Sequence, residues 1–219
     1  DFGFRAAHAF SEKFAAKVSF SYMKGTDWFA NDTSEFNNDN TSVGQPDDVL
    51  AYRSSPTHDG INIYGDEIAM SSAGTNMNEV AQYLESIGVL PAGASNLVPA
   101  DDVARTGYLE EVFTDYNAES IKFDLSLNYR PTGGDLEIVF NTRGGYGSTI
   151  YQGTNRYQIK NFLMQQHKLE IRNKDFFVRG YMTTEDAGDS YDMRFTGINM
   201  AKYKASEWFG AYTGDYFQG

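Results

Sequence analysis

Four carboxylates gather within eight residues toward the C-terminal end of the chain, and their spacing suggests cation chemistry. The segment 185–192 contains Glu185, Asp186, Asp189 and Asp192. Carboxylate oxygens suit a hard cation such as calcium, but the segment lacks the glutamate at the twelfth position of an EF-hand loop. An acidic, solvated loop is the simpler interpretation. We therefore expect no metal site. Asp186, Asp189 and Asp192 are kept as a weak candidate for calcium binding.

The residue types that enzymes use as nucleophiles and bases form no comparable pattern. The histidines are His8, His58 and His167, which lie far apart in the sequence, and there is no cysteine. No Gly-x-Ser-x-Gly, His-Glu-x-x-His or phosphate-binding glycine motif is present. We therefore expect no catalytic residue, no cofactor and no enzymatic activity.

A second group of side chains suits binding. Tyrosine and tryptophan in polar segments are common contact residues for sugars, peptides and protein partners. Packing inside ordered loops is the alternative for these aromatic residues, and loop-to-loop hydrogen bonds are the alternative for the acidic ones. The candidate ligand or partner contacts are Trp28, Tyr52, Tyr64, Asp66, Glu67, Tyr151 and Arg156.

Composition narrows the class of protein. The 219 residues contain 18 Lys and Arg against 30 Asp and Glu, which gives a formal net charge of −12 and argues against nucleic-acid binding. The absence of cysteine excludes disulfides and thiolate metal sites. The mean hydropathy of −0.51 is typical of a soluble protein. A membrane β-strand, however, is only half apolar and has similar values.

Strict alternation of apolar and polar residues predicts β-strands. It runs without interruption through 121–129 and resumes after the turn residues 130–134. Phe162 and Met164 are out of phase with Leu169, for which we expect a β-bulge near 165–166. The same alternation predicts three strand hairpins, at about 1–28, 119–142 and 158–186.

The connections at the other end of these strands are long. We expect loops at about 29–118, 144–157 and 187–219, and loops of more than about 15 residues are usually functional. Within the first, Asn76 begins an Asn-x-x-Glu cap. Val80, Leu84 and Ile87 follow at helical spacing, so the sequence predicts a short amphipathic helix.

Short turns at one end, long loops at the other and one apolar face are typical of an outer-membrane β-barrel. The strands also reach the roughly 9–11 residues that a membrane-spanning strand needs. Aromatic residues flank both ends of the strands, as in the interfacial girdles of such barrels. A soluble β-sandwich is the alternative. The charged residues expected to face the barrel lumen, or whatever domain fills it, are Arg5, Lys17, Lys122, Asp124, Glu137 and Arg179.

Seven longer motifs are distributed along the chain. They are RAAHAFSEKFAAK (5–17), YMKGTDW (22–28), DGINIYGDE (59–67), RTGY (105–108), IYQGTNRY (150–157), QQHKLEIRNK (165–174) and EDAGDSYDMRFT (185–196). On these motifs, which occur in the same order, nearly the whole chain resembles TonB-dependent outer-membrane receptors of Bacteroidota, and the first motif is similar to a barrel hairpin of that family.

The resemblance implies an all-β fold, a partial antiparallel transmembrane barrel with about six of roughly 22 strands. The chain would be an internal fragment of the barrel domain, with the plug domain absent and the long loops extracellular. Such receptors lie in the cell outer membrane and import siderophores, oligosaccharides or peptides with energy from TonB. Implied partners are outer-membrane lipids, the plug of the same parent chain, TonB indirectly and a SusD-like surface lipoprotein.

Two other classes of function stay open from the sequence. The first is an outer-membrane scaffold or surface-binding protein that uses the same barrel without transporting anything. The second is a soluble β-sandwich adhesin module. The long segment 29–118 favours the scaffold, because it is larger than a ligand gate needs.

Overall fold

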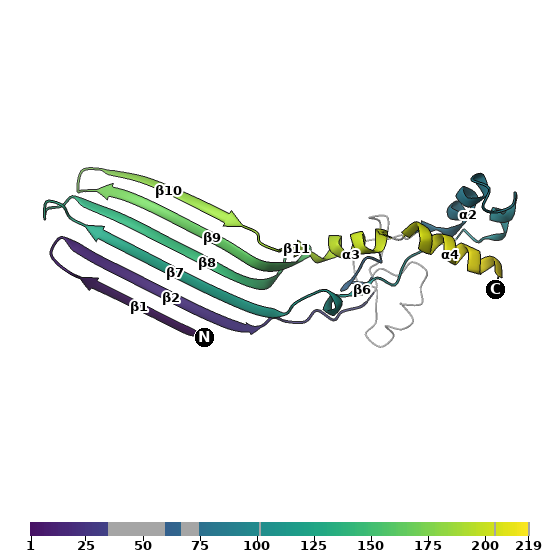
Figure 1. Ribbon diagram of the computed structural model, residues 1–219, viewed down its shortest axis with the longest axis horizontal. Helices are drawn as coiled ribbons and strands as arrows, with labels where there is room; N and C mark the ends of the chain where they lie inside the picture. Colours follow the sequence, from purple (N-terminus) through teal and green to yellow (C-terminus); the bar gives the residue numbers. More distant parts are fainter. Residues whose placement is uncertain (35–59, 67–74, 101, 204, 219) are drawn as a thin grey trace. The chain divides into compact units, whose positions relative to one another are not determined.

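The computed structural model describes residues 1–34, 60–66, 75–100, 102–203 and 205–218, and these form two compact units (Figure 1). The sheet unit comprises Asp1–Trp28 and Asp115–Tyr191. The helical unit comprises Phe29–Thr114 and Asp192–Gly219. The chain therefore leaves the sheet after β2, builds part of the helical unit, returns for four long strands and ends in the helical unit.

The sheet unit is one antiparallel sheet with the strand order β1-β2-β7-β8-β9-β10, drawn side by side in Figure 1. Tight hairpins join β1 to β2, β7 to β8 and β9 to β10 at one end of the sheet, and a three-residue turn at 153–155 joins β8 to β9 at the other end. A largely antiparallel β fold is thus confirmed. The strands are β1 (Phe2–Ala9), β2 (Phe14–Thr26), β7 (Asn117–Tyr129), β8 (Glu137–Gln152), β9 (Arg156–Arg172) and β10 (Phe177–Asp186), and β11 (Tyr191–Asp192) also pairs with β9.

The register gives this sheet two chemically different faces, because directly opposed residues share a face and successive residues alternate. On one face, the apolar face, the four rows from Tyr129 to Phe123 contain no Asp, Glu, Lys or Arg in any of the six strands. On the other, the polar face, Ser19, Asp124, Arg143 and Gln166 form one continuous row. The alternation of apolar and polar residues along each strand therefore gives the sheet one apolar and one polar face.

Two details of the sheet correct the sequence analysis. The prediction of a loop at 144–157 is wrong, since β8 extends to Gln152 and β9 begins at Arg156. The prediction of a β-bulge near 165–166 is also wrong, because β9 and β10 pair without interruption there. The register shift lies instead between β8 and β9, next to Gly147, where Asn161 adopts a φ of 57°.

The phase change that suggested this bulge has another cause. Phe162 and Met164 lie on the polar face, and His167 lies on the apolar face. The Oγ1 of Thr142 and the Nδ1 of His167 are 2.8 Å apart and share a hydrogen bond across the two strands. Pairing of these two polar groups lowers the cost of placing each of them on an apolar surface.

The helical unit combines short strands and helices around its own core. That core consists of Met77, Ala81, Val98, Val103 and Phe209. None of the described helices is long and apolar enough to span a membrane. The elements are β3 (Ile63–Tyr64), β4 (Thr75–Asn76), α2 (Met77–Ser86), η1 (Ala94–Leu97), β5 (Asp102–Val103), β6 (Tyr108–Leu109), η2 (Glu110–Val112), α3 (Met193–Lys202) and α4 (Ala205–Gln218).

The predicted helix is confirmed as α2, and its cap is the one expected. The side-chain oxygen of Asn76 accepts hydrogen bonds from the backbone N–H groups of Asn78 and Glu79. The expectation that 187–219 is a loop is wrong, because α3 and α4 fill most of it. α4 contains glycines at positions 210 and 214, and because glycine disfavours helix, the sequence of this segment gave no clear helical signal.

Glycine permits the closest approach inside the helical unit, where α3 meets β3. A Cβ on Gly65, whose φ is +89°, would lie 2.3 Å from the carbonyl oxygen of Gly197. A Cβ on Gly197 would in turn lie 2.5 Å from the Cβ of Tyr64. Both positions therefore require glycine, which explains how α3 covers the short strand that carries Tyr64.

Candidate functional site

All six charged residues expected to face a lumen or plug lie on the polar face of the sheet. Lys122 is opposite Ser21 and Gly145, and Asp124 is opposite Ser19 and Arg143. Because opposed residues share a face, the register places the whole set together. The set is Arg5, Lys17, Lys122, Asp124, Glu137 and Arg179.

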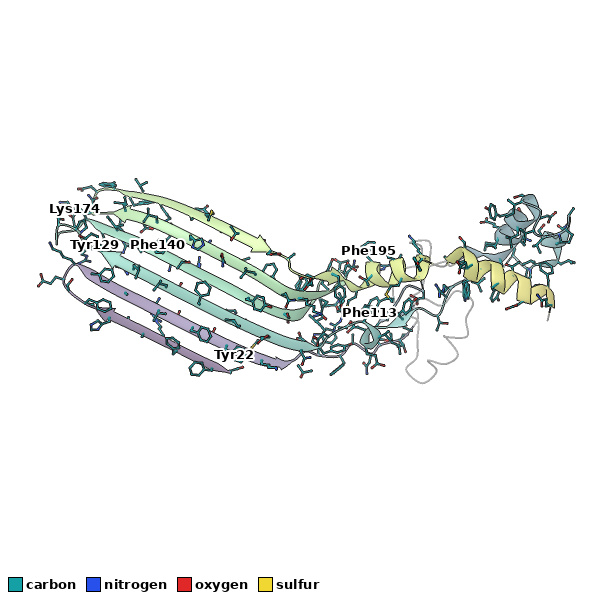
Figure 2. All side chains as sticks on the ribbon, in the orientation of Figure 1. Tyr22, Phe113, Tyr129, Phe140, Lys174 and Phe195 are labelled. Carbon is teal, nitrogen blue, oxygen red and sulfur yellow. The ribbon has the colours of Figure 1, made fainter. Side chains whose placement is uncertain are left out.

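The apolar face is exposed across the sheet. Phe2 and Phe4 are 61% and 49% exposed, although aromatic rings of this size are normally buried. Figure 2 shows Tyr129 and Tyr22 at opposite ends of the strands, where the girdles were expected. Large exposed side chains on this face are Phe2, Phe4, Phe10, Phe14, Val18, Phe123, Tyr129, Phe140, Tyr146, Leu169, Ile171, Val178 and Met182.

An ion-pair network occupies the polar face near the tight hairpins. Glu170, which is only 3% exposed, accepts a 2.5 Å hydrogen bond from the Nε of Arg179. Its carboxylate also lies 3.6 Å from the Nζ of Lys168 and 3.4 Å from Nη1 of Arg172. Arg172 donates at the same time to Glu137 through a 2.8 Å contact from Nη2. These charges therefore neutralise one another within the sheet.

The other end of the polar face is hollowed rather than filled. A hollow of about 720 Å³ lies over β2, β7, β8 and β9. On the polar face its lining includes five small residues, Ser19, Ser21, Ser120, Gly145 and Gly147. Lys122 lies among them, directly opposite both Ser21 and Gly145. Short side chains at these positions leave room for the hollow.

Arg156 and Trp28, both candidate contact residues, are brought together beyond the hollow. The guanidinium of Arg156 lies 3.8 Å from the centroid of the Trp28 ring, and Nη2 donates to the Trp28 carbonyl oxygen at 2.8 Å. Arg156 is 2% exposed, so it stabilises the position of Trp28 rather than contacting a ligand. Trp28 and Tyr151 remain 55% and 57% exposed, and they are the available contact residues.

The β8–β9 hairpin also fixes the two points where the chain leaves and rejoins the sheet. Asp27 accepts hydrogen bonds from the Thr149 hydroxyl at 2.9 Å and the Ile150 N–H at 2.7 Å. The Asp115 N–H donates to the side chain of Gln158, which is almost fully buried. Sequence reasoning missed Asp27 and Gln158 because their partners lie more than 40 residues away.

Asp115 also closes the start of β7. Its carboxylate accepts hydrogen bonds from the N–H and the side-chain amide of Asn117. These two bonds hold the pKa of Asp115 below its usual range, because they stabilise the charged form. Asp115 is therefore charged at neutral pH, and it holds the backbone at the point where β7 begins.

Two of the predicted contact residues are buried in the helical unit, which contradicts a direct role in binding. Tyr64 is 5% exposed and donates its hydroxyl to Glu110 at 2.9 Å. Asp66 is fully buried and accepts a hydrogen bond from the Gly60 N–H at 2.6 Å. Both residues stabilise the fold of this unit. Tyr52 and Glu67 lie outside the described residues.

The three carboxylates of the weak calcium candidate have separate structural roles. Asp186 accepts from the Gly188 N–H, and Asp189 accepts from the side chain of Asn161. Asp192 caps α3 by accepting from the Phe195 N–H. In the described part of the chain, no three acidic or histidine side chains are arranged to hold a metal ion.

No family model, curated protein or solved structure matches this chain. The functional argument therefore depends on the geometry of the sheet and on the chemistry of its two faces.

Proposed function

We propose that the chain forms part of the transmembrane barrel of a TonB-dependent outer-membrane receptor that imports a nutrient. The observation that carries the proposal is the chemical difference between the two faces. Four successive rows of the apolar face contain no charged residue over six strands, whereas the polar face is rich in charge. A lipid-facing charge costs about 2–4 kcal/mol at the bilayer midplane, so a lipid-facing surface excludes charge.

A soluble sandwich accounts less well for the same face. In a sandwich a second sheet covers the apolar face of the first. Among the described residues of the sheet unit, no second sheet covers this one, and its phenylalanines stay exposed. Strands of up to 17 residues also exceed the usual length in sandwiches. Lipid is therefore the better partner for this surface.

The two edge strands support membership in a larger barrel. Within the described residues β1 pairs only with β2, and β10 pairs only with β9. An unpaired strand edge is not tolerated in lipid, because its backbone N–H and C=O groups find no partners there. Further strands of the parent protein would complete the pairing and close the barrel.

In this proposal the polar face lines the lumen and contacts the plug, and the long connections are extracellular. Trp28 and Tyr151 are positioned to contact a ligand or a SusD-like surface lipoprotein. The imported nutrient belongs to one of the three classes that such receptors carry, namely siderophores, oligosaccharides and peptides.

Uptake by cells tests this function. Asn76 and Asp102 are directly opposed in β4 and β5, so residues 77–101 can be replaced by an Asn-Gly turn. In a strain that depends on the whole protein for a limiting nutrient, we expect this excision to abolish TonB-dependent uptake. An insertion at Gly133 in the β7–β8 turn is the matched control and should leave uptake intact. Unchanged uptake after the excision would contradict the role of the extracellular segment.

A scaffold that binds surface partners without import is the second candidate. The independent core of the helical unit favours it, because a simple gate needs no such core. If cells that lack TonB retain the full function of the protein, the scaffold replaces the importer.

A further inference from the structure

The polar face has a net charge opposite in sign to that of the chain. In its regularly paired rows, seven cationic residues face four carboxylates, a balance of +3 in a chain whose formal charge is −12. The cations are Arg5, Lys17, Lys122, Arg143, Lys168, Arg172 and Arg179. The carboxylates are Asp124, Glu137, Glu170 and Glu185. A local excess of one charge on a low-dielectric surface raises the local concentration of ions of the opposite charge.

The hollow is lined by two of these cations, Lys122 and Arg143, and by the carboxylates of Glu119 and Asp124, so its formal charges balance and what distinguishes it is how the cations are paired. The network around Glu170 neutralises most of the charge near the tight hairpins. At the hollow, neither Lys122 nor Arg143 forms an ion pair with any residue that the structure describes. Arg143 instead donates to the neutral side-chain oxygen of Gln166 from Nε at 2.9 Å. Asp124, opposite Arg143, accepts a hydrogen bond from Asn141.

The positions of the two cations suit recognition of one anionic group. Lys122 is directly opposite Gly145, and Arg143 is two residues from Gly145 on the same face. Such diagonal cross-strand neighbours are roughly 7–8 Å apart, a distance that two long side chains can bridge toward a shared anion. Arginine and lysine both pair well with carboxylate and phosphate oxygens.

The remaining lining provides hydrogen bonds and an apolar surface. The hydroxyls of Ser19, Ser21 and Ser120 make no hydrogen bond within the described part of the chain, so they are available to a ligand. Phe162 and Met164, both on the polar face, add apolar contacts. A volume of about 720 Å³ is that of a small-molecule site.

We propose that this hollow binds an organic anion, a small molecule with a carboxylate or phosphate group attached to an apolar body. Lys122 and Arg143 contact the anionic group, the serines donate hydrogen bonds to its oxygens, and Phe162 and Met164 contact the apolar part. This proposal rests on the proposed function in one respect. If the sheet lines the lumen of a barrel, the hollow makes organic anions a class of molecule that the lumen binds.

The absence of cysteine from the chain allows a direct test in the whole protein. Ser120→Cys introduces one thiol in the lining of the hollow, with any cysteine elsewhere in the parent changed to serine. Outer-membrane vesicles are treated with an anionic methanethiosulfonate (the ethylsulfonate) or a cationic one (the ethyltrimethylammonium). We expect the anionic reagent to react about 10-fold faster relative to the cationic one than at a Thr132→Cys reporter in a tight turn.

Charge variants and competing ligands complete the experiment. Lys122→Gln with Arg143→Gln should remove the preference for the anionic reagent, and Lys17→Gln, elsewhere on the same face, should leave it. Benzoate and phenyl phosphate should slow the labelling in protein with intact cations, and neutral benzyl alcohol should not. Faster protection by one of the two anions identifies carboxylate or phosphate as the preferred group.

Three results would overturn the proposal. They are equal rates for both reagents, a thiol that neither reagent reaches because protein fills the hollow, and labelling that no anion slows. TonB-dependent uptake is measured separately. A protected, cation-dependent hollow in a protein that imports nothing would support the anion site and remove the transport function.

Discussion

The two ends of the polar face have the same alternation of residues and opposite outcomes. Near the tight hairpins, Glu137 and Glu170 form ion pairs with three cations. At the other end, glycine and serine leave a hollow beside Lys122 and Arg143, which have no carboxylate partner in the described chain. One end neutralises its own charges, and the other presents charges to a ligand.

This contrast indicates which charged residues are structural. A charge that is buried and fully paired contributes to stability, and its loss leaves partners uncompensated. An exposed charge without a partner contributes little to stability and is free to bind. Substitution of two residues of the same type on the same face is thus expected to change the free energy of unfolding by very different amounts. The following variants test that expectation.

The largest effect is expected at the filled end. Glu170→Gln should lower the free energy of unfolding by more than any other variant described below, because three cations lose their shared carboxylate. Asp124→Asn at the open end is the control and should change it by less than about 1 kcal/mol. Denaturant unfolding in detergent micelles, followed by tryptophan fluorescence, measures both. Equal losses would remove the distinction between the two ends.

Two neighbouring glycines give the next test. A Cβ on Gly147 would lie 2.2 Å from the Glu119 carbonyl oxygen, whereas nothing lies closer than 3.9 Å to a Cβ on Gly145. Gly147→Ala should therefore cost about 2 kcal/mol through backbone displacement. Gly145→Ala should be neutral or stabilise by about 0.5 kcal/mol, because alanine restricts the unfolded chain more than glycine does. The same unfolding assay compares them, and the opposite order would contradict the register.

Arg156→Lys tests a contact outside both ends. Lysine keeps the charge but loses the planar stacking on Trp28, so we expect a loss of about 1 kcal/mol. Amide hydrogen exchange should become faster at Asp27 and Trp28 in particular. Arg5→Lys, on the exposed strand β1, is the matched substitution and should leave exchange unchanged. A uniform increase over the whole sheet would show that Arg156 acts globally instead.

The smallest effect is expected in the helical unit, where Glu85 accepts hydrogen bonds from the N–H groups of Gly93 and Ser95. These bonds lower the pKa of Glu85 from its ordinary value, because they stabilise the charged carboxylate. A lowered folded-state pKa means that the added stability is present above the unfolded-state pKa and is lost as the pH falls through the folded one. The protection of the α2 amides against hydrogen exchange, relative to the intrinsic rate at each pH, should thus fall below about pH 4.5. Glu85→Gln should be less stable at pH 7 and less sensitive to acid.

The strands were predictable because their signal is local. Alternation over 121–129 needs no knowledge of neighbouring strands, and the Asn76 cap is contained within four residues. The position of the register shift was not predictable, since it belongs to the pairing of β8 with β9, next to Gly147 and Asn161. Periodicity along one strand carries no information about how its neighbour is paired.

The candidate site was only partly predictable for the same reason. The face of each charged residue follows from alternation, so the polar-face set could be named from the sequence. The partners of Glu170 come from three strands, and only the register brings them together. Tyr64 and Asp66 looked like exposed loop residues. α3, about 130 residues later in the chain, packs against β3 and helps to bury Tyr64.

The central claim is that one face of the sheet contacts lipid and the other lines an aqueous lumen. Nitroxide labels placed singly at eight consecutive positions, 121–128 of β7, in the whole protein in outer-membrane vesicles test it most directly. Collision with oxygen, which concentrates in lipid, should be high at Ile121, Phe123, Leu125 and Leu127 and low at the positions between them. Equal collision rates with oxygen and with a water-soluble nickel chelate at all eight positions would contradict the membrane-spanning sheet.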